Sequence, residues 1–275
     1  MAIKGIDCST VLTKTDAAAL YALGYRFVCR YLVPEKYRKH LSAEEAKILT
    51  DAGFKLLSVF ETTADRAKGG AASGAEDGAL ALQAAKKINM PTSGIIFFAV
   101  DFDALQKDMN TVEAYLRAAA QQTEGYKIGV YGGYAVVEAM AARGACSGFW
   151  QTYSWSGGKI SEHATVYQYL NGQTAAGISV DLDEAYSEAG LWNYSDTGSD
   201  LNMTIDEARA SLTELDGTGG AHSAWAEQAV TKLQAAGLFE GDGKGNFGWE
   251  QCLTREALAE VLYKTLDKLG LLDKL

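Results

Sequence analysis

Up to about residue 185, short runs of β-branched and aromatic residues alternate with longer alanine-rich stretches. The short runs predict strands, and the alanine-rich stretches predict helices between them. The run Ile95–Val100 is apolar at every position, as expected of a parallel-sheet strand that is covered on both faces. The predicted strands are Ala2–Asp7, Arg26–Tyr31, Phe54–Phe60, Gly94–Asp101, Lys127–Tyr131, Gly148–Tyr153, Thr165–Tyr169 and Gly177–Asp181.

Helix signals stand between these strands. Ser42 with Glu45 predicts a capping box at a helix start, and Gly53 follows the end of the same segment. Asn110 with Glu113 predicts a second capping box. The order of elements is therefore a repeated strand and helix.

This repetition predicts an α/β fold. Eight parallel strands with crossover helices can close into a (β/α)₈ barrel, although about 185 residues is fewer than the roughly 200–250 usual for that fold. We therefore expect an irregular, small TIM-like barrel in which the later helices are short or missing. A doubly wound open sheet is the alternative, ranked second because no GxGxxG turn follows the first strand.

The composition changes after the last predicted strand. From Leu191 the chain is rich in Asn, Ser, Asp, Thr and Gly, which predicts a linker. Beyond it, a helical pattern over 224–236, a glycine-rich loop and a second helical pattern over 254–269 predict a small all-α helix-loop-helix module. The predicted domains are a barrel at 1–190, a linker at 191–220 and the module at 221–275.

Composition and charge limit the classes of partner. The chain has 275 residues with 35 acidic and 25 basic side chains, a net charge of −10. Such a protein is repelled by nucleic-acid phosphates and anionic lipid, so we expect neither nucleic acid nor membrane as a partner. No apolar run approaches the roughly 20 residues of a membrane helix. Met1–Asp7 shows no signal-peptide pattern, which predicts a cytoplasmic location at first.

Cysteine and histidine spacing argues against several chemistries. Cys8, Cys29, Cys146 and Cys252 form no CxxC pair, and no histidines are spaced to join them, so we expect buried reduced thiols, no metal centre and no cofactor. No GxSxG motif is present, so a serine nucleophile is not predicted.

Acidic residues gather where strands are predicted to end. In a barrel these ends face one mouth, where catalytic side chains collect. Because residues two apart on a strand share a face, Asp101 and Asp103 are expected to face the mouth together, with Phe102 outward. The acids are Asp7, Glu61, Asp101, Asp103, Asp181 and Asp183.

Crowded carboxyl groups suit cleavage of a glycosidic bond. Crowding raises one pKa and leaves another group ionised, which supplies a proton donor and an anionic partner. Two alternatives stay open. The acids could instead pair with Arg26, Arg30 or Lys55, or together hold Ca²⁺ or Mg²⁺.

Aromatic and amide side chains near the same ends could bind a sugar, because flat faces stack on rings and amides bond hydroxyls. Trp155, in the loop Ser154–Gly158, is predicted to be exposed. The candidate substrate-binding residues are Tyr31, Tyr131, Trp155, Gln168 and Asp183.

With these residues laid out, residues 3–186 resemble the glycoside-hydrolase-like domains distantly related to the family 25 lysozymes of bacteria and phages. The resemblance implies an irregular (β/α) barrel that acts on or binds bacterial wall glycan, with Asp7, Asp101, Asp103 and Asp181 at its mouth. It rests on Gly5–Asp7, Ala67–Gly70, Phe98–Asp103, Gly129–Tyr134, Trp150–Thr152, Trp155–Gly158, Tyr167–Gln168 and Val180–Asp183.

One departure from that family concerns the proton donor. Family 25 lysozymes carry Asp-x-Glu after the fourth strand, whereas this chain has Asp101-Phe-Asp103, one methylene shorter. The resemblance leaves Asp103 or Glu61 as the donor. Asp101 and Asp7 would then stabilise positive charge or orient the substrate, and Asp181 would shape the site.

Residues 222–269 resemble an S-layer homology module, a module similar to those that anchor proteins to secondary polymers of Gram-positive walls. By motif match, Trp225, Asp242 and Arg255 are the implied wall-polymer contacts, Arg255 because a guanidinium binds anionic groups bidentately. This chain has one clear copy where three are usual, which predicts a homo-oligomer formed through the module. Phe247–Trp249 stands where an Arg-Pro is common.

Together these features predict an endolysin-like hydrolase of peptidoglycan glycan strands, from a bacteriophage or a Gram-positive bacterium, acting at the cell wall once released. One alternative is a catalytically inactive glycan-binding or scaffold protein on the same barrel. The other is a metal-dependent hydrolase of phosphodiester or amide bonds.

Overall fold

A computed structural model describes residues 2–194 and Tyr263 of the chain. The predicted module at 221–275, apart from Tyr263, and most of the predicted linker lie outside these residues. The predicted boundaries of the module therefore stay predictions.

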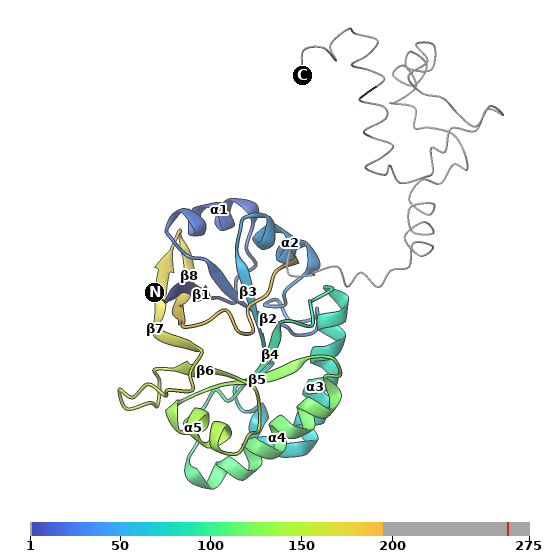
Figure 1. Cartoon of the computed structure of the whole chain (residues 1–275), viewed down its shortest axis with the longest axis vertical. Helices are drawn as coiled ribbons and strands as arrows, with labels where there is room; N and C mark the ends of the chain where they lie inside the picture. Colours follow the sequence, from blue (N-terminus) through green and yellow to red (C-terminus); the bar gives the residue numbers. More distant parts are fainter. Residues whose placement is uncertain (1, 195–262, 264–275) are drawn as a thin grey trace, which may run out of the picture. The chain divides into compact units, whose positions relative to one another are not determined.

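Eight strands form a closed barrel in chain order, with helices lying outside the ring of strands (Figure 1). The α/β barrel prediction is confirmed, and the open-sheet alternative is wrong. Neighbouring strands from β1 to β7 are parallel, but β8 is antiparallel to both β7 and β1. The strands are β1 (Ile3–Asp7), β2 (Phe27–Tyr31), β3 (Lys55–Phe60), β4 (Ile95–Ala99), β5 (Lys127–Gly132), β6 (Gly148–Thr152), β7 (Val166–Ala175) and β8 (Ile178–Ala185).

The reversal of β8 corrects the prediction of eight parallel strands. Ala176 and Gly177 join β7 to β8 with φ of 51° and 82°, the backbone of a tight hairpin turn. A two-residue turn can join only antiparallel strands, because a parallel pair needs a long crossover.

Helices separate the strands only as far as β6. After β6, the described chain passes to β7 and β8 without an intervening helix, as the short length predicts. The helical segments are α1 (Lys14–Ala22), α2 (Ala43–Asp51), η1 (Arg66–Gly69), α3 (Gly70–Lys87), η2 (Gln106–Asp108), α4 (Met109–Gln122) and α5 (Tyr134–Ala142).

The two predicted capping boxes fare differently. Ser42 caps α2, because its side chain accepts a hydrogen bond from the Glu45 N–H. The Glu45 side chain does not return to Ser42 but pairs with buried Arg30. The second prediction is wrong, since Asn110 lies within α4 and Glu113 pairs with arginines.

Two separate cores hold the barrel. One lies between the strands and the helices, and the other fills the inside of the barrel. Inside, the fully buried Phe97 ring occupies space that only glycine leaves open: a Cβ added at Gly129 or Gly148 would lie 2.6 or 2.9 Å from it. The barrel interior is therefore packed at this level and holds no channel.

The barrel includes residues placed in the linker by sequence analysis. Leu191 and Trp192 are buried, and the Trp192 indole donates to Ser58 Oγ at 2.9 Å. The backbones of Trp192 and Leu56 form an isolated antiparallel bridge near the start of β3. Leu191 packs in the core inside the barrel, and Trp192 packs in the core between the strands and the helices.

Cys8 and Cys29 are buried free thiols and Cys146 is half-buried, while Cys252 lies outside the described residues. Burial raises the pKa of Cys8 to about 11. This thiol is therefore protonated and unreactive near neutral pH. Among the described residues, no helix is long and apolar enough to cross a membrane.

Candidate active site

The inward-facing positions of the strands change from apolar to polar toward one end of the barrel. There they line a cleft of about 170 Å³. Four acids from β1, β8 and the segments after β3 and β4 meet in it, although they lie far apart in the sequence. The lining residues are Asp7, Tyr31, Val59, Glu61, Ala99, Asp101, Tyr131, Trp150, Gln168, Asn171 and Asp181.

Asp7 forms the floor of the cleft and is 8% exposed. Its Oδ2 accepts a hydrogen bond of 2.7 Å from Gln168 Nε2. The Oε1 of the same amide accepts bonds from the Tyr131 hydroxyl at 2.9 Å and from Thr152 at 2.7 Å, which fixes the direction of its NH₂ group. Burial, opposed by the bond from Gln168 and reinforced by the charge of Asp181, raises the pKa of Asp7 to about 7.

Asp101 is half-buried at the wall of the cleft. Burial raises its pKa above the usual value, and the negative charge of Glu61 adds to the effect. Lys39 opposes it, because its ammonium favours the ionised form of Asp101. The same ammonium pairs with Glu61 Oε2 at 3.1 Å.

Aromatic rings close two sides of the cleft. The Lys39 ammonium stands 4.1 Å from the centroid of the Tyr31 ring. Tyr131 and Trp150, which also line the cleft, pack edge to face with their ring centroids 4.7 Å apart. Tyr31 and Tyr131 thus hold polar groups in place while offering ring surface to a ligand.

A bulge shapes the β8 side of the cleft. The pairing of β7 with β8 shifts register between Leu170 and Gln173, so Asn171 and Gly172 leave the ladder. The Gly172 N–H donates to Asp181 Oδ1 at 2.7 Å and orients that carboxylate. Asn171 lines the cleft, and its buried Oδ1 has no hydrogen-bond donor among the described residues.

The structure brings most of the predicted site residues together. Of the predicted catalytic acids, Asp7, Glu61, Asp101 and Asp181 line the cleft. Of the predicted substrate-binding residues, Tyr31, Tyr131 and Gln168 line it. The roles of these side chains stay proposals.

Three predicted residues lie elsewhere. Asp103 is exposed and does not line the cleft, because β4 ends at Ala99 and the chain bends at Phe102. The expectation that Asp101 and Asp103 share a face is therefore wrong. Trp155 is exposed, as predicted, but is not part of the lining. Asp183 is fully buried beneath the cleft.

The positions of Asp181 and Asp183 relative to the last strand also differ from the prediction. They do not follow the end of β8 but lie within it, and Asp181 is paired in register with Asp7. Because β8 runs against β1, its middle and not its end reaches the cleft level.

The alternative in which basic residues neutralise the acids fails for both arginines. The guanidinium of Arg30 binds Glu45 and the carbonyl of Cys8, and that of Arg26 binds the carbonyls of Tyr21 and Tyr25. Among residues 2–194 and 263, no group of three or more potential ligand side chains is arranged to hold a metal ion.

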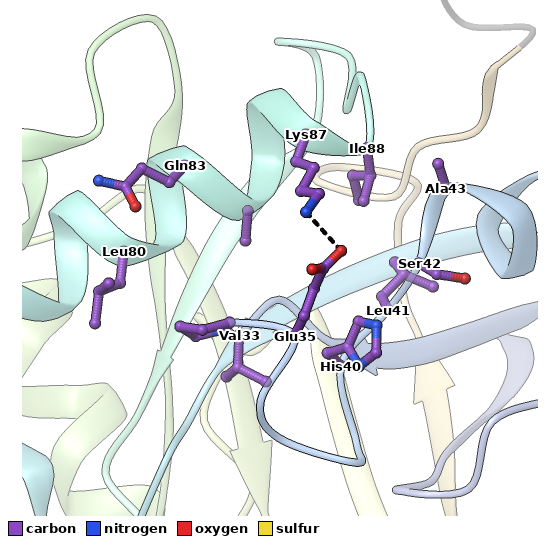
Figure 2. A pocket seen from close by; sticks show the side chains of 12 residues that line it. Val33, Glu35, His40, Leu41, Ser42, Ala43, Leu80, Gln83, Lys87 and Ile88 are labelled. Carbon is purple, nitrogen blue, oxygen red and sulfur yellow. Dashed lines mark ion pairs between the residues drawn. The ribbon is translucent and has the colours of Figure 1, made fainter.

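A second, larger cavity of about 310 Å³ lies between the loop after β2 and the end of α3. Its walls are mainly aliphatic, and Figure 2 shows Glu35 and Lys87 pointing toward one another in it. These two side chains form an ion pair of 2.6 Å. Their charges are thus already matched, whereas four carboxyl groups and no basic side chain of the described residues line the first cleft. The first cleft is therefore the candidate active site.

Sequence reasoning missed one side chain of the cleft, Asn171, and one basic residue that pairs with a cleft acid, Lys39. Lys39 follows no strand end but lies in the loop before α2, and Asn171 lies in the bulge of β7. The Asn171-Gly172 pair reads as an ordinary turn signal, so only the bulge reveals its place. The predicted wall-polymer contacts Trp225, Asp242 and Arg255 lie outside the described residues.

Two family descriptions match separate segments of the chain. Residues 18–186 match the family described as Rv2525c-like, glycoside hydrolase-like domain. Residues 219–259 match the S-layer homology domain. A Bacillus subtilis protein described as uncharacterized protein FadG is 28% identical over 145 residues, which cover 46% of this chain and 24% of that protein. The chain thus spans about a quarter of that curated relative.

Solved structures share the fold at low identity. The Tat-secreted protein Rv2525c of Mycobacterium tuberculosis, in complex with L-tartrate, matches with a TM-score of 0.62 and 20% identity over 70% of this chain and 98% of the other. An uncharacterized Bacillus stearothermophilus protein matches with a TM-score of 0.55 and 22% identity over 69% and 100% of the two chains. At these identities the likeness concerns the fold.

Proposed function

Because the chain belongs to the Rv2525c-like, glycoside hydrolase-like domain family, we propose that its barrel binds and hydrolyses the glycan strands of bacterial peptidoglycan. The observation that carries the proposal is the cleft itself. Four acids from β1, β8 and the segments after β3 and β4 line one pocket, and two of them, Asp7 and Asp101, have raised pKa values. A glycosidase needs this combination of a protonated and an ionised carboxyl group.

In this mechanism Asp101 donates the proton to the leaving oxygen. It combines a pKa raised by burial with a position on the cleft wall that substrate can reach. Glu61 suits the role less well, since Lys39 binds its carboxylate directly. Asp103, the donor favoured by the family pattern, is exposed outside the cleft.

The remaining acids face the positive charge that develops at the sugar. Asp181 is oriented by the Gly172 N–H, and Asp7 by the amide of Gln168. Both carboxyl groups stay near one position because their donors are fixed by the backbone or by further hydrogen bonds. Such preorganised groups stabilise charge in the transition state without reorganising.

A measurement of new reducing ends tests hydrolysis. Purified full-length protein is incubated with peptidoglycan in EDTA, so that metal-dependent cleavage does not contribute. We expect release that falls by at least about 100-fold in Asp101→Asn, the usual scale for a general acid. Asp103→Asn is the matched control, with the same substitution two residues away on an exposed side chain, and should retain release.

A second candidate is glycan binding without cleavage, and the position of Asp103 outside the cleft favours it. In that case the wild-type protein would sediment with peptidoglycan and release no reducing ends.

The proposed proton donor has its own contradicting outcome. Loss of release in Asp103→Asn with full release in Asp101→Asn would show that Asp101 is not the donor.

For the S-layer homology segment we propose binding to a secondary wall polymer through Trp225, Asp242 and Arg255, which directs the protein to the cell wall and brings chains together as a homo-oligomer. The test is co-sedimentation with walls that carry or lack the polymer. Arg255→Ala should abolish polymer-dependent sedimentation. Arg209→Ala, in the predicted linker, should not change it.

A further inference from the structure

Asp183 lies one level below the cleft, inside the barrel. On β8 it pairs in register with Gly5 of β1 and with Gln168 of β7, whereas Asp181 pairs with Asp7. Its side chain is fully buried and does not line the cleft. Substrate therefore cannot reach it, and its role needs another explanation than the sugar contact predicted from the sequence.

The hydrogen bonds of Asp183 account for only half of its carboxyl group. Oδ1 accepts a bond of 2.8 Å from the indole of Trp150. Oδ2 is buried and has no donor among the described residues. The neighbour within hydrogen-bond reach is Asp7, which is itself a carboxyl group. Two ionised carboxylates cannot bond one another, so one of the two must carry a proton.

Within residues 2–194, the side chains that act on the Asp183 carboxyl group include no cation. Trp150 from β6, Asp7 from β1 and Asp181 from its own strand surround it, with Cys29 of β2 and Tyr131 of β5 close enough to feel its charge. None of these side chains carries a positive charge. A buried carboxylate without a cation or several donors is costly, so the neutral acid is favoured.

We propose that Asp183 is a protonated carboxylic acid whose Oδ2–H donates a hydrogen bond to Asp7, which makes Asp183 a positioning residue for the cleft. Asp183 keeps its proton at neutral pH, and no charge is lost or gained when the bond forms. Asp7 then receives two donors, the Asp183 hydroxyl and the Gln168 amide. These fix the carboxylate in the floor and let it gain and lose its own proton near neutral pH.

Burial and the nearby negative charge of Asp7 raise the pKa of Asp183 well above its usual value, in agreement with this arrangement. The pKa of Asp7, about 7, is raised by burial but lowered by the bonds from Gln168 and Asp183. The deeper acid therefore keeps its proton while the upper one titrates. The importance of this pair for catalysis rests on the proposed function, whereas its protonation does not.

Carbon-13 NMR of the aspartate carboxyl carbons tests the assignment in the full-length protein without substrate. In the wild type, the Asp183 resonance should stay at its protonated position above the pKa of Asp7. Asp183→Asn, which also donates a hydrogen bond without charge, should leave the pKa of Asp7 within about one unit. Asp183→Ala, which donates nothing, should raise it further.

Asp181→Asn is the matched control, because it removes a negative charge that raises the pKa of Asp7. It should lower that pKa. If Asp183 is ionised, its resonance will sit at the ionised position and Asp183→Asn will lower the pKa of Asp7 at least as much as the control does. That result overturns the proposal.

The wild-type spectrum decides the question even if a variant fails to fold. The experiments also distinguish an error in the proposed hydrolysis from an error in the proposed protonation of Asp183. If no variant or wild-type protein releases reducing ends while Asp183 stays protonated, the proposed function is wrong and the proton pair stands. If reducing ends are released and Asp183 is ionised, the proposed proton pair is wrong and the proposed function stands.

Discussion

The two ends of the barrel interior use the same inward-facing alternation for opposite purposes. At the base, Phe27, Phe97 and Val166 are fully buried and apolar. On β1, Gly5 pairs in register with Phe27, and the inward position two residues later is Asp7. Four residues after Phe97, Asp101 lines the cleft. The fold is thus stabilised at one end by packed apolar volume, and the other end is occupied by carboxyl groups that burial disfavours in their charged form.

The comparison indicates that different residues of the barrel interior determine its stability and its chemistry. Substitutions at the base should change the free energy of unfolding at any pH. Substitutions at the cleft should change ligand affinity or activity, and should change the free energy of unfolding in a way that depends on pH, through the protonation of the buried acids.

The largest effect is expected from Phe97→Ala at the base. Removal of this ring opens a cavity between Gly129 and Gly148, which have no side chains to fill it. The free energy of unfolding should fall by about 3–5 kcal/mol, measured by chemical denaturation. Phe102→Ala is the matched control, and should cost less because Phe102 is half-buried. Equal losses in the two variants would contradict a packed base.

The base is also the part that the sequence predicts best. Apolar runs such as Ile95–Val100 identify the strands directly, because both of their faces are buried. The direction of β8 could not be predicted from such runs. It depends on the Ala176-Gly177 turn, and a two-residue turn is recognised only once the ends of both strands are known.

Glu45 shows why local motifs mislead. Its spacing from Ser42 predicts a capping box, but Arg30 lies in a distant strand and offers a charged partner in a buried layer. The Glu45 carboxylate also accepts the Leu12 N–H at 2.9 Å. Tertiary contacts thus replace the local hydrogen bond, and no sequence window contains all three residues.

The second prediction concerns the pH dependence of stability at the cleft. The pKa of Asp7 is about 7 in the folded protein and 3.8 as an ordinary aspartate, so folding favours the protonated form. The contribution of Asp7 is complete below about pH 4 and is lost as the pH rises to about 7, by up to about 4 kcal/mol. Asp7→Asn should remove this loss, seen as a flatter plot of unfolding free energy against pH.

Asp16→Asn supplies the control, because Asp16 is a half-buried acid in the capping box of α1, away from the cleft. That variant should keep the wild-type decline between about pH 4 and 7. Protonated Asp183 contributes a decline of its own over this range, so some slope should remain in Asp7→Asn. A plot as steep as that of the wild type would mean that Asp7 does not contribute to the decline.

The candidate site was predictable in outline and not in detail. The strand-end rule places Asp7, Glu61 and Asp101 correctly, because it depends only on the direction of β1, β3 and β4. It fails for Asp103, since alternation ends where the chain bends. It also cannot separate Asp181 from Asp183, because depth in the barrel is set by register with β1.

A smaller effect is expected from Asn171→Ala. The buried Oδ1 of Asn171 lacks a donor among the described residues, so its removal should not lower the free energy of unfolding. A bound glycan fragment would lose an acceptor for a hydroxyl or amide hydrogen, and affinity should fall about tenfold by calorimetry. Asn110→Ala on α4 should bind like the wild type. Unchanged affinity in Asn171→Ala would place the ligand elsewhere in the cleft.

The smallest effect is expected from Lys39→Met. The Lys39 ammonium lowers the pKa of Asp101 but is partly exposed, so solvent weakens its influence. Its loss should raise the pKa of Asp101. The alkaline limit of glycan release should then move to higher pH, because Asp101 keeps its proton longer. Lys36→Met in the same loop is the control, and an equal shift there would mean that net charge, not the contact, sets the pKa of Asp101.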